Sequence, residues 1–342
     1  MERFNVAVIG VGAVGIEILK ILKQRNFSID NLRVFARSSR TIEIDGQKYQ
    51  VEAISEENFD NIDIALFAGT EGEKGASVLY AHKFIEKGAV VIDNGSDFRL
   101  KEDVPLVVPE INEDRIFTHK GLIANPNCTT IQAVVSLGGI YKNFGLEKFI
   151  LVSFQATSGA GKKASLTLWG ETKEIVEKNK DVNFDQIDKK IKASQIFGYQ
   201  IAFNVIPKIG DFKEYNYTSE EWKVVKETYK ILDDSSIKIT ATCVRVPVFT
   251  SHSEAIYFKT KKNATLKEIG EVLKETRGVK YFPADFPLPL EVEGKDEVFV
   301  ARLREDPFER NCFWLWSVSD NLRKGAALNA VQIAEVLAPS LI

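Results

Sequence analysis

Cysteine and histidine are both scarce in this chain, which has three of each among its 342 residues. Cys128, Cys243 and Cys312 are too few and too widely spaced for a disulfide framework, so we expect a protein of the reducing cytoplasm. The sequence also lacks a His, Cys and Asp cluster at metal-ligand spacing, and no metal is expected. No apolar run approaches the roughly 18 residues of a membrane-spanning helix, so no membrane partner is expected.

Neither sign of charge dominates the composition. The 45 Lys and Arg residues nearly balance the 48 Asp and Glu residues, giving a formal net charge of −3. Without a basic stripe, nucleic acid is not an expected partner. A hydrophobic content of 44% and a charged content of 27% are ordinary for a soluble globular enzyme. At about 150 residues per domain, the length predicts two domains.

The first third of the chain alternates strands and helices. This rhythm predicts a parallel, doubly wound sheet with helices on both faces, a Rossmann-type domain. The expected strands are 5–10, 32–36, 62–68 and 89–92, and the expected helices are 13–25 and 74–87.

A glycine-rich run lies between the first strand and the first helix. Gly10 permits a tight turn, Gly12 lets the backbone approach a pyrophosphate, and Gly15 allows close packing of helix on strand. The flanking strand and helix make dinucleotide binding a better interpretation than a purely structural turn.

The residues after the second strand indicate which dinucleotide binds. Enzymes that use NAD place an acid there for the ribose 2′-hydroxyl, and the run 35–40 has none. Arg37 and Arg40 offer guanidinium groups and Ser38 offers a hydroxyl, which suit a 2′-phosphate. The sequence therefore favours NADP over NAD, although Arg40 also fits a solvated basic loop.

The second part of the chain has a mixed pattern, which predicts an α+β domain built on one large sheet and suited to catalysis and dimerisation. We place the nucleotide-binding domain at 1–127, completed by a C-terminal segment 322–342, and the catalytic domain at 128–321. Expected strands are 149–157, 238–246, 255–259 and 298–303, and expected helices are 163–178, 219–232, 265–275 and 325–337, the last returning to the nucleotide domain.

Cys128 is the candidate nucleophile. Asn125, Pro126 and Asn127 form a predicted turn that stops a strand, and the residues after Cys128 begin a helix. Backbone N–H groups at a helix N-terminus favour a thiolate and can hold an oxyanion. The alternative is that Cys128 is a small buried hydrophobic residue.

His252 is the candidate proton shuttle. It follows the predicted strand 242–248 and is expected in the loop 250–253, from which it could reach a site. His82 lies in a predicted helix and His119 in a polar turn, so both are expected to have surface or packing roles.

Several motifs converge on one family. Over essentially its whole length, the chain resembles the aspartate-semialdehyde dehydrogenases. The matching segments are Pro126-Asn127-Cys128-Thr129-Thr130, Gln155 with Ser158-Gly159-Ala160-Gly161, 203–207, 241–247, 251–254, 318–327 and 329–335.

The resemblance implies a fold like that of the phosphorylating glyceraldehyde-3-phosphate dehydrogenases. It also implies reversible NADPH-dependent reduction of L-4-aspartyl phosphate to L-aspartate 4-semialdehyde and phosphate. This step feeds lysine, threonine, methionine and diaminopimelate synthesis. Cys128 would carry a thioester, His252 would act as acid–base catalyst, and Gln155 would orient the substrate or acyl group.

The same resemblance assigns the charged groups. Arg245 would bind the substrate carboxylate and Glu220 the ammonium, while Arg99, Asn127 and Lys223 would bind phosphate. Without the resemblance, Glu220 and Lys223 would be taken for a solvated helix face. The cofactor residues would be Gly10, Gly12, Ala13, Val14 and Gly15 at the pyrophosphate, Arg37 and Ser38 at the 2′-phosphate, and Ser158, Gly159 and Asn321 near the nicotinamide.

The chain departs from the family in two places. Many members have one more residue in the glycine loop, so a tighter pyrophosphate loop is expected here. The loop 68–74 carries Glu71 and Glu73, which near a cofactor phosphate would be repulsive and would weaken NADP binding. Alternatively, these acids point into solvent.

Two other functions are open to the sequence. N-acetyl-γ-glutamyl-phosphate reductase shares the reaction type, but its acylated substrate amine needs no partner such as Glu220. A nucleotide-sensing protein of the same fold would not require Cys128, Gln155, Arg245 and His252 together. A homodimer is expected by resemblance, because the second sheet must cover its outer face.

Overall fold

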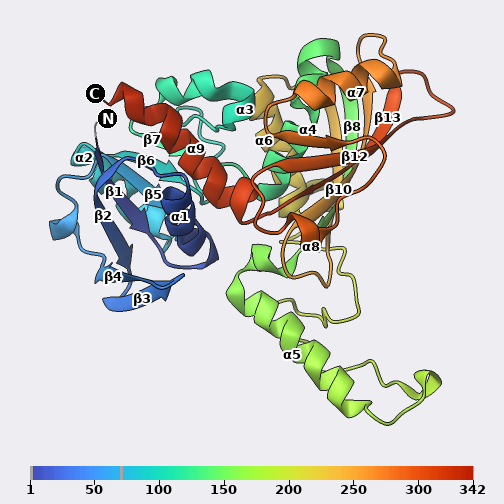
Figure 1. Cartoon of the computed structure of the whole chain (residues 1–342), viewed down its shortest axis with the longest axis horizontal. Coiled ribbons are helices and arrows are strands. Elements are labelled where there is room, and N and C mark those ends of the chain that lie inside the picture. Colours follow the sequence, from blue (N-terminus) through green and yellow to red (C-terminus); the bar gives the residue numbers. More distant parts are fainter. Residues whose placement is uncertain (1–2, 70–71, 342) are drawn as a thin grey trace.

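Two sheets lie side by side in the computed structural model, which describes residues 3–69 and 72–341 (Figure 1). The nucleotide-binding half has seven strands in the order β3-β4-β2-β1-β5-β6-β7, and the other half has six in the order β11-β12-β13-β10-β8-β9. Both predicted fold classes are therefore confirmed.

The seven-stranded sheet is parallel except for its edge strand β3. Its central strands are apolar and buried on both faces, as expected where helices cover both sides. The strands are β1 (Phe4–Ile9), β2 (Ile29–Ala36), β3 (Arg40–Ile44), β4 (Gln47–Ala53), β5 (Ile64–Phe67), β6 (Val90–Asp93) and β7 (Leu122–Ala124).

The hairpin of β3 and β4 was not predicted, although the sequence carries its signal. Asp45 and Gly46 join the two strands with φ values of 48° and 77°. An Asp-Gly pair between alternating residues is typical of a two-residue hairpin turn that needs positive φ at both positions. The hairpin extends the sheet next to β2, where the candidate 2′-phosphate residues begin.

The predicted terminal helix begins as a π-helical turn, Arg323–Ala327, and continues as α9 (Leu328–Leu337). Helix α9 packs against α1 (Ala13–Gln24), so the end of the chain returns to the nucleotide-binding half as predicted (Figure 1). Helix α2 (Ala76–Glu86) also belongs to this half.

The six-stranded sheet has a covered face and an open face. Helices α4 (Cys128–Phe144), α6 (Ser219–Leu232) and α7 (Leu266–Glu275) bury an apolar core against one face. Strands β11 and β13 were missed, and β10 begins three residues before the prediction. The strands are β8 (Leu146–Gln155), β9 (Lys238–Arg245), β10 (His252–Thr260), β11 (Val279–Phe282), β12 (Val298–Glu305) and β13 (Cys312–Ser319).

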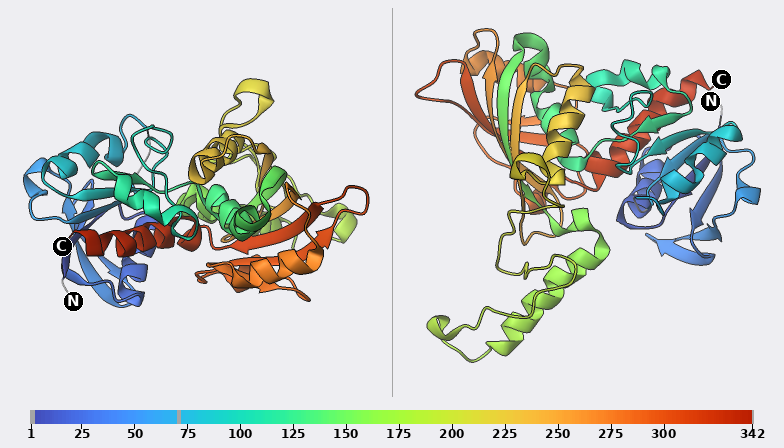
Figure 2. Two further views of the ribbon diagram at one scale, coloured as in Figure 1. Left: turned by 90° about the horizontal axis from the view of Figure 1, so that it is seen from above. Right: turned by 180° about the vertical axis from the view of Figure 1, so that it is seen from behind.

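On the open face, the short helix α8 (Pro289–Val292) packs Val292 against Phe299 and Val318. Helix α5 (Lys162–Lys178) extends away from the rest of the protein as a long arm (Figures 1 and 2). Helix α3 (Pro109–Asn112) is short and contacts α4 and α9. Among the described residues, no helix has the length and apolar character needed to cross a membrane.

Glu254 is an acid in the middle of the covered face. It is fully buried on β10 between Ser153 of β8 and Ser317 of β13, and neither carboxylate oxygen has a hydrogen-bond partner among the described residues. Burial raises the pKa of Glu254 well above its usual value. The side chain is therefore held in its neutral form.

This burial predicts a pH-dependent stability. Above a pH near 4.5 the carboxyl ionises in the unfolded chain but not in the folded one, so rising pH favours unfolding by up to about 1.4 kcal/mol per pH unit. Glu254→Gln should lessen the fall in melting temperature between pH 5.5 and 8. Thermal unfolding followed by circular dichroism measures this, with exposed Glu293→Gln as control. Parallel curves for Glu254→Gln and the unsubstituted protein would contradict a neutral carboxyl.

Candidate active site

Two cavities meet at Ala68 and Gly69, after β5. One, of about 690 Å³, is lined by the glycine loop and the end of β2. The other, of about 650 Å³, is lined by Cys128 and by residues of both halves. The two cavities therefore lie next to one another, one beside the glycine loop and the other beside the thiol.

The glycine loop is shaped for close approach. A Cβ at Gly10, whose φ is 102°, would lie 2.6 Å from the carbonyl oxygen of Ala68. A Cβ at Gly15 would lie 1.9 Å from the carbonyl oxygen of Gly10, whereas Gly12 faces open space. Helix α1 begins after Gly12 with no side-chain cap, so its first N–H groups suit an anion.

The exposed end of β2 brings cations to the nucleotide cavity. Arg37, Ser38 and Arg40 all line it, and Arg40 donates from Nη1 to Ser38 Oγ at 3.2 Å. The acidic loop 68–74 was expected to repel a cofactor phosphate. Its Lys74 lines the nucleotide cavity, whereas its Glu73 is exposed and does not line it. Glu71 lies outside the described residues.

Cys128 is the first residue of α4, as predicted. The preceding residue, Asn127, is the N-cap, and its Oδ1 accepts hydrogen bonds from the N–H groups of Thr129 at 3.0 Å and Thr130 at 3.3 Å. A Cβ at Gly325 would lie 2.9 Å from Cys128 Cβ, so the π-helical turn packs closely on the nucleophile.

The expectation that the helix N-terminus favours a thiolate is not met in the ligand-free protein. Burial and the nearby Glu220 carboxylate raise the pKa of Cys128 to about 11, against the opposing effects of Arg245, Arg99 and the Thr129 N–H. Asn127 Oδ1 takes up two of the N–H groups at this helix end, which leaves less of the helix's positive end for the sulfur.

His252 pairs with Cys128 but lies on a strand rather than in the predicted loop, as the first residue of β10. Its Nε2 is 3.4 Å from Cys128 Sγ, and its Nδ1 accepts the Ala156 N–H at 3.1 Å. Because Nδ1 is an acceptor, the neutral ring carries its hydrogen on Nε2, facing the sulfur. Burial and Arg245 lower the pKa of His252 well below its usual value.

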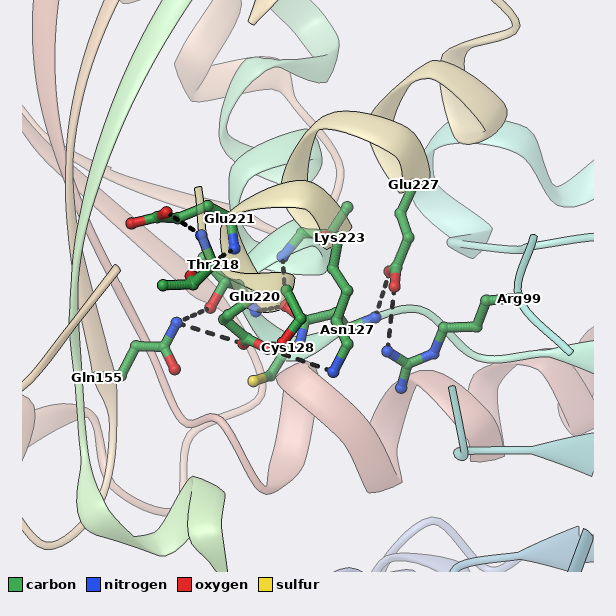
Figure 3. Close-up of polar contacts among 12 residues, drawn as sticks. Arg99, Asn127, Cys128, Gln155, Thr218, Glu220, Glu221, Lys223 and Glu227 are labelled. Carbon is green, nitrogen blue, oxygen red and sulfur yellow. Dashed lines mark hydrogen bonds and ion pairs between the residues drawn. The ribbon is translucent and has the colours of Figure 1, made fainter. Parts of the chain in front are cut away.

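Glu220 lies at the centre of the polar contacts in Figure 3. Its Oε1 accepts from Asn127 Nδ2 at 2.9 Å and from Gln155 Nε2 at 3.4 Å, and its Oε2 is 3.4 Å from Lys223 Nζ. Burial acts to raise the pKa of Glu220, but Lys223 and Asn127 outweigh it and lower the pKa below the usual value. The site thus holds a buried carboxylate facing the cleft.

Arg245 and Gln155 come from neighbouring strands and lie opposite one another in the register of β8 and β9. Arg245 is buried and donates from Nη1 to the carbonyl oxygen of Ala156 at 2.6 Å. A Cβ at Gly159 would lie 3.2 Å from Arg245 Nη1 and 3.4 Å from His252 Nε2. Glycine therefore lets the chain pass directly over both side chains.

Arg99 is fixed by main-chain and side-chain acceptors. It donates from Nε to the carbonyl oxygen of Asn125 at 2.9 Å, from Nη2 to that of Asn94 at 2.8 Å, and from Nη1 to Glu227 Oε1 at 3.1 Å. Glu227 is a functional candidate that the sequence analysis missed. Its only local signal is a spacing of seven residues from Glu220, which puts both on one face of α6.

Asn321 joins the residues expected near the nicotinamide. Its Oδ1 accepts from Ser158 Oγ at 3.0 Å and from the Ser251 N–H at 3.0 Å. The cleft therefore brings most of the predicted site residues together, although His252 lies just behind its wall. Those lining it are Ala13, Val14, Arg99, Asn127, Cys128, Gln155, Ser158, Gly159, Glu220, Lys223, Arg245 and Asn321.

Within residues 3–69 and 72–341, no group of three or more His, Cys, Asp or Glu side chains is placed to hold a metal ion. The chemistry available is a thiol beside an imidazole, surrounded by cations and one carboxylate.

The two halves match two family models. Residues 5–119 match the NAD binding domain of semialdehyde dehydrogenases, and residues 137–324 match their dimerisation domain. A nucleotide-binding fold with a cysteine and histidine pair in the cleft thus defines an oxidoreductase of the semialdehyde dehydrogenase class.

Individual relatives narrow the class. The chain is 45% identical to the aspartate-semialdehyde dehydrogenase of Aquifex aeolicus, covering 98% of each chain, and 44% identical to that of Bacillus subtilis, covering 97% of each. Aspartate semialdehyde dehydrogenase II of Vibrio cholerae has a crystal structure with a TM-score of 0.92 and 41% identity, covering 100% of both chains. The chain belongs to the aspartate-semialdehyde dehydrogenase family.

The charges around Cys128 give a testable prediction. Glu220→Gln should lower the pKa of the thiol, because the Glu220 carboxylate disfavours the thiolate, and Arg245→Gln should raise it. The rate of iodoacetamide alkylation measured against pH reports both shifts. Cys128→Ser gives the background, since Cys243 and Cys312 are buried. Identical profiles for the two variants would show that these charges do not control the thiol.

Proposed function

We propose that the protein catalyses the reversible, NADPH-dependent reduction of L-4-aspartyl phosphate to L-aspartate 4-semialdehyde and phosphate. The observation that carries this proposal is the pair of Cys128 Sγ and His252 Nε2, 3.4 Å apart, in which Cys128 lines the cleft together with Glu220 and Arg245 while His252 lies just behind its wall. The relatives named aspartate-semialdehyde dehydrogenase support the same substrate. The step would serve lysine, threonine, methionine and diaminopimelate synthesis.

The charges of the cleft complement those of the substrate. Arg245 suits the α-carboxylate, buried Glu220 suits the α-ammonium, and Arg99, Lys223 and Asn127 suit the phosphate. A further structure of the Vibrio cholerae enzyme, 40% identical with a TM-score of 0.93, is described as a complex with ASA. That relative supports binding of the same substrate by this chain.

Cys128 would form the covalent intermediate. In the direction of synthesis its thiolate attacks the acyl carbon, the carbon–oxygen bond to phosphate breaks, and phosphate leaves with the bonding electrons. NADPH, held with its nicotinamide beside Ser158, Gly159 and Asn321, would supply the hydride equivalent that reduces the resulting thioester. Collapse of the thiohemiacetal breaks the carbon–sulfur bond, releases the aldehyde and restores the Cys128 sulfur. Gln155 would orient the acyl group.

His252 would work through Nε2. With Nδ1 bound to the Ala156 N–H, Nε2–H is a hydrogen-bond donor to the thiolate and to an oxyanion on the same carbon. Acting as a base at Nε2 requires the ring hydrogen to move to Nδ1, which breaks the bond from Ala156. The acid–base role that the resemblance implies therefore depends on opening this one hydrogen bond.

NADP would bind along the nucleotide cavity. The uncapped N-terminus of α1 suits the pyrophosphate, with Gly10, Gly12, Ala13, Val14 and Gly15 around it. Arg37 and Ser38 would bind the 2′-phosphate. Ser158, Gly159 and Asn321 would face the nicotinamide, beside Cys128. We assign residues 1–127 with 322–342 to this domain and 128–321 to the catalytic domain.

The open face of the six-stranded sheet supports a homodimer. Phe154, Trp314 and Trp316 are only half-buried there, Ile150 is exposed, and the alternate residues of these strands form the core. A half-buried aromatic face of this kind suits a second copy of the chain. The match to a dimerisation domain over 137–324 agrees with this assignment.

The reductase of N-acetyl-γ-glutamyl phosphate is the alternative with the same chemistry. Its acylated amine carries no positive charge, so a buried carboxylate such as Glu220 would lack its partner. The contacts that lower the pKa of Glu220 keep it ionised, which favours a substrate with a free ammonium.

The first experiment follows NADP⁺ reduction at 340 nm with L-aspartate semialdehyde, with and without phosphate. We expect NADPH formation that depends on phosphate and is abolished in Cys128→Ala, because the acyl-enzyme requires the thiol. Activity only with N-acetylglutamate semialdehyde would overturn the substrate assignment. Binding of NADP without activity on either aldehyde would favour a nucleotide-sensing protein.

The choice of cofactor gives a second prediction. Arg37→Ala should reduce kcat/KM for NADP by about 10-fold or more, through loss of a charge-assisted hydrogen bond, and leave kcat/KM for NAD nearly unchanged. Steady-state rates with each dinucleotide make the comparison, so NAD serves as the internal control. Comparable rates with NADP and NAD in the unsubstituted protein would contradict the proposed preference.

A further inference from the structure

A third cavity lies beside the catalytic cleft. It has a volume of about 300 Å³ and shares Arg99, Ser219 and Lys223 with the cleft. Glu227 lines this side cavity but not the cleft. It therefore approaches Arg99 from the side away from the thiol and is not placed to touch a substrate.

The Glu227 carboxylate joins two parts of the site (Figure 3). Its Oε1 accepts from Arg99 Nη1 at 3.1 Å, and its Oε2 accepts from the main-chain N–H of Asn127 at 2.7 Å. Asn127 immediately precedes Cys128. One side chain thus holds both a proposed phosphate ligand and the backbone that presents the nucleophile.

Helix α6 keeps this carboxylate in place. Its first turn is closed by a capping box between Thr218 and Glu221, and Glu221 Oε1 also accepts from the Cys243 N–H of β9 at 3.1 Å. Glu220, Lys223 and Glu227 are spaced three and four residues apart, so they project from one face of a helix that is anchored to the sheet.

Arg99 and Glu227 depend on one another as a buried pair of opposite charges. Arg99 and Glu227 are almost fully buried, with 7% and 1% of their side chains exposed, and a buried charge without a partner is costly. Burial raises the pKa of Glu227, while Arg99 and the Asn127 N–H act to lower it. Both oxygens accept hydrogen bonds, which is the arrangement of an ionised carboxylate.

We propose that Glu227 is a positioning residue for phosphate: it fixes the Arg99 guanidinium and the Asn127 main chain in the orientation that phosphate binding beside Cys128 requires. This inference rests on the proposed function, since it concerns the phosphate step of that reaction. An orienting role outweighs the repulsion between the carboxylate and phosphate, because the Glu227 carboxylate fixes the position of a buried guanidinium.

Glu227→Gln tests the inference. The amide retains one acceptor oxygen, so it can serve Arg99 or the Asn127 N–H but turns an NH₂ donor toward the other. We expect the KM for phosphate to rise about 10-fold or more in the NADP⁺ reduction assay, with the KM values for aldehyde and NADP changed less than 3-fold. Glu227→Asp keeps the negative charge but has a side chain one methylene shorter, so it should raise the KM for phosphate by an intermediate factor. This variant tests the inference if Glu227→Gln does not fold.

Glu171→Gln is the matched control, because Glu171 is also a buried helical acid that accepts main-chain N–H groups, but it lies on α5, outside the cleft. It should lower the melting temperature and leave the KM for phosphate unchanged. In an Arg99→Gln background, Glu227→Gln should raise the phosphate KM by a smaller factor than it does alone, since the part of its effect that passes through Arg99 is already lost and only the part that passes through the Asn127 main chain remains.

The outcomes separate the two proposals. An unchanged phosphate KM in both Glu227 variants, in a protein with phosphate-dependent activity, would overturn the positioning role alone. A lower phosphate KM in Glu227→Gln would also overturn it, by showing that charge repulsion dominates. Absence of phosphate dependence in the unsubstituted protein would overturn the proposed function itself.

Discussion

The hydrogen bonds of Asn127 are the constraint on which the rest of the site depends. Its Oδ1 caps α4, its Nδ2 donates to Glu220, and its main-chain N–H donates to Glu227. The residue before the nucleophile is thus fixed by its own helix and twice by α6. Because two of these bonds go to buried carboxylates, a shift of Cys128 along the helix axis would break a bond to a buried charge, which is costly.

The charges around Cys128 explain why a helix N-terminus does not by itself produce a thiolate here. Glu220 disfavours the thiolate, whereas Arg245 and Arg99 favour it, and burial decides the balance in the ligand-free protein. In the proposed complex, a substrate ammonium beside Glu220 would offset the effect of its carboxylate. Binding the correct substrate would then lower the pKa of the thiol, and nucleophilicity would be linked to recognition.

Local patterns made half of this architecture predictable, together with the position of Cys128 at the start of a helix. The glycine run needs only a strand before it and a helix after it, and Cys128 follows a turn that is visible in the sequence. The Asp45-Gly46 hairpin was equally visible but was overlooked. Glu227 and Glu254 were not predictable, because their importance comes from partners or neighbours more than 60 residues away, such as Arg99 and Ser317. The position of His252 on a strand likewise depends on its pairing with Ser319.

The π-helical turn before α9 connects cofactor and nucleophile in space. Arg323 donates to Glu17 on α1 at 2.6 Å and to Asp296 of the catalytic half at 2.6 Å, and it is almost fully buried. Two residues further on, Gly325 leaves no room for a side chain against Cys128. A π-helical turn is rare and is frequently found at functional sites. Here its contacts tie the helix that would carry the pyrophosphate to the wall behind the thiol. One buried segment, and not a flexible linker, therefore connects α1 to the residues that pack against Cys128.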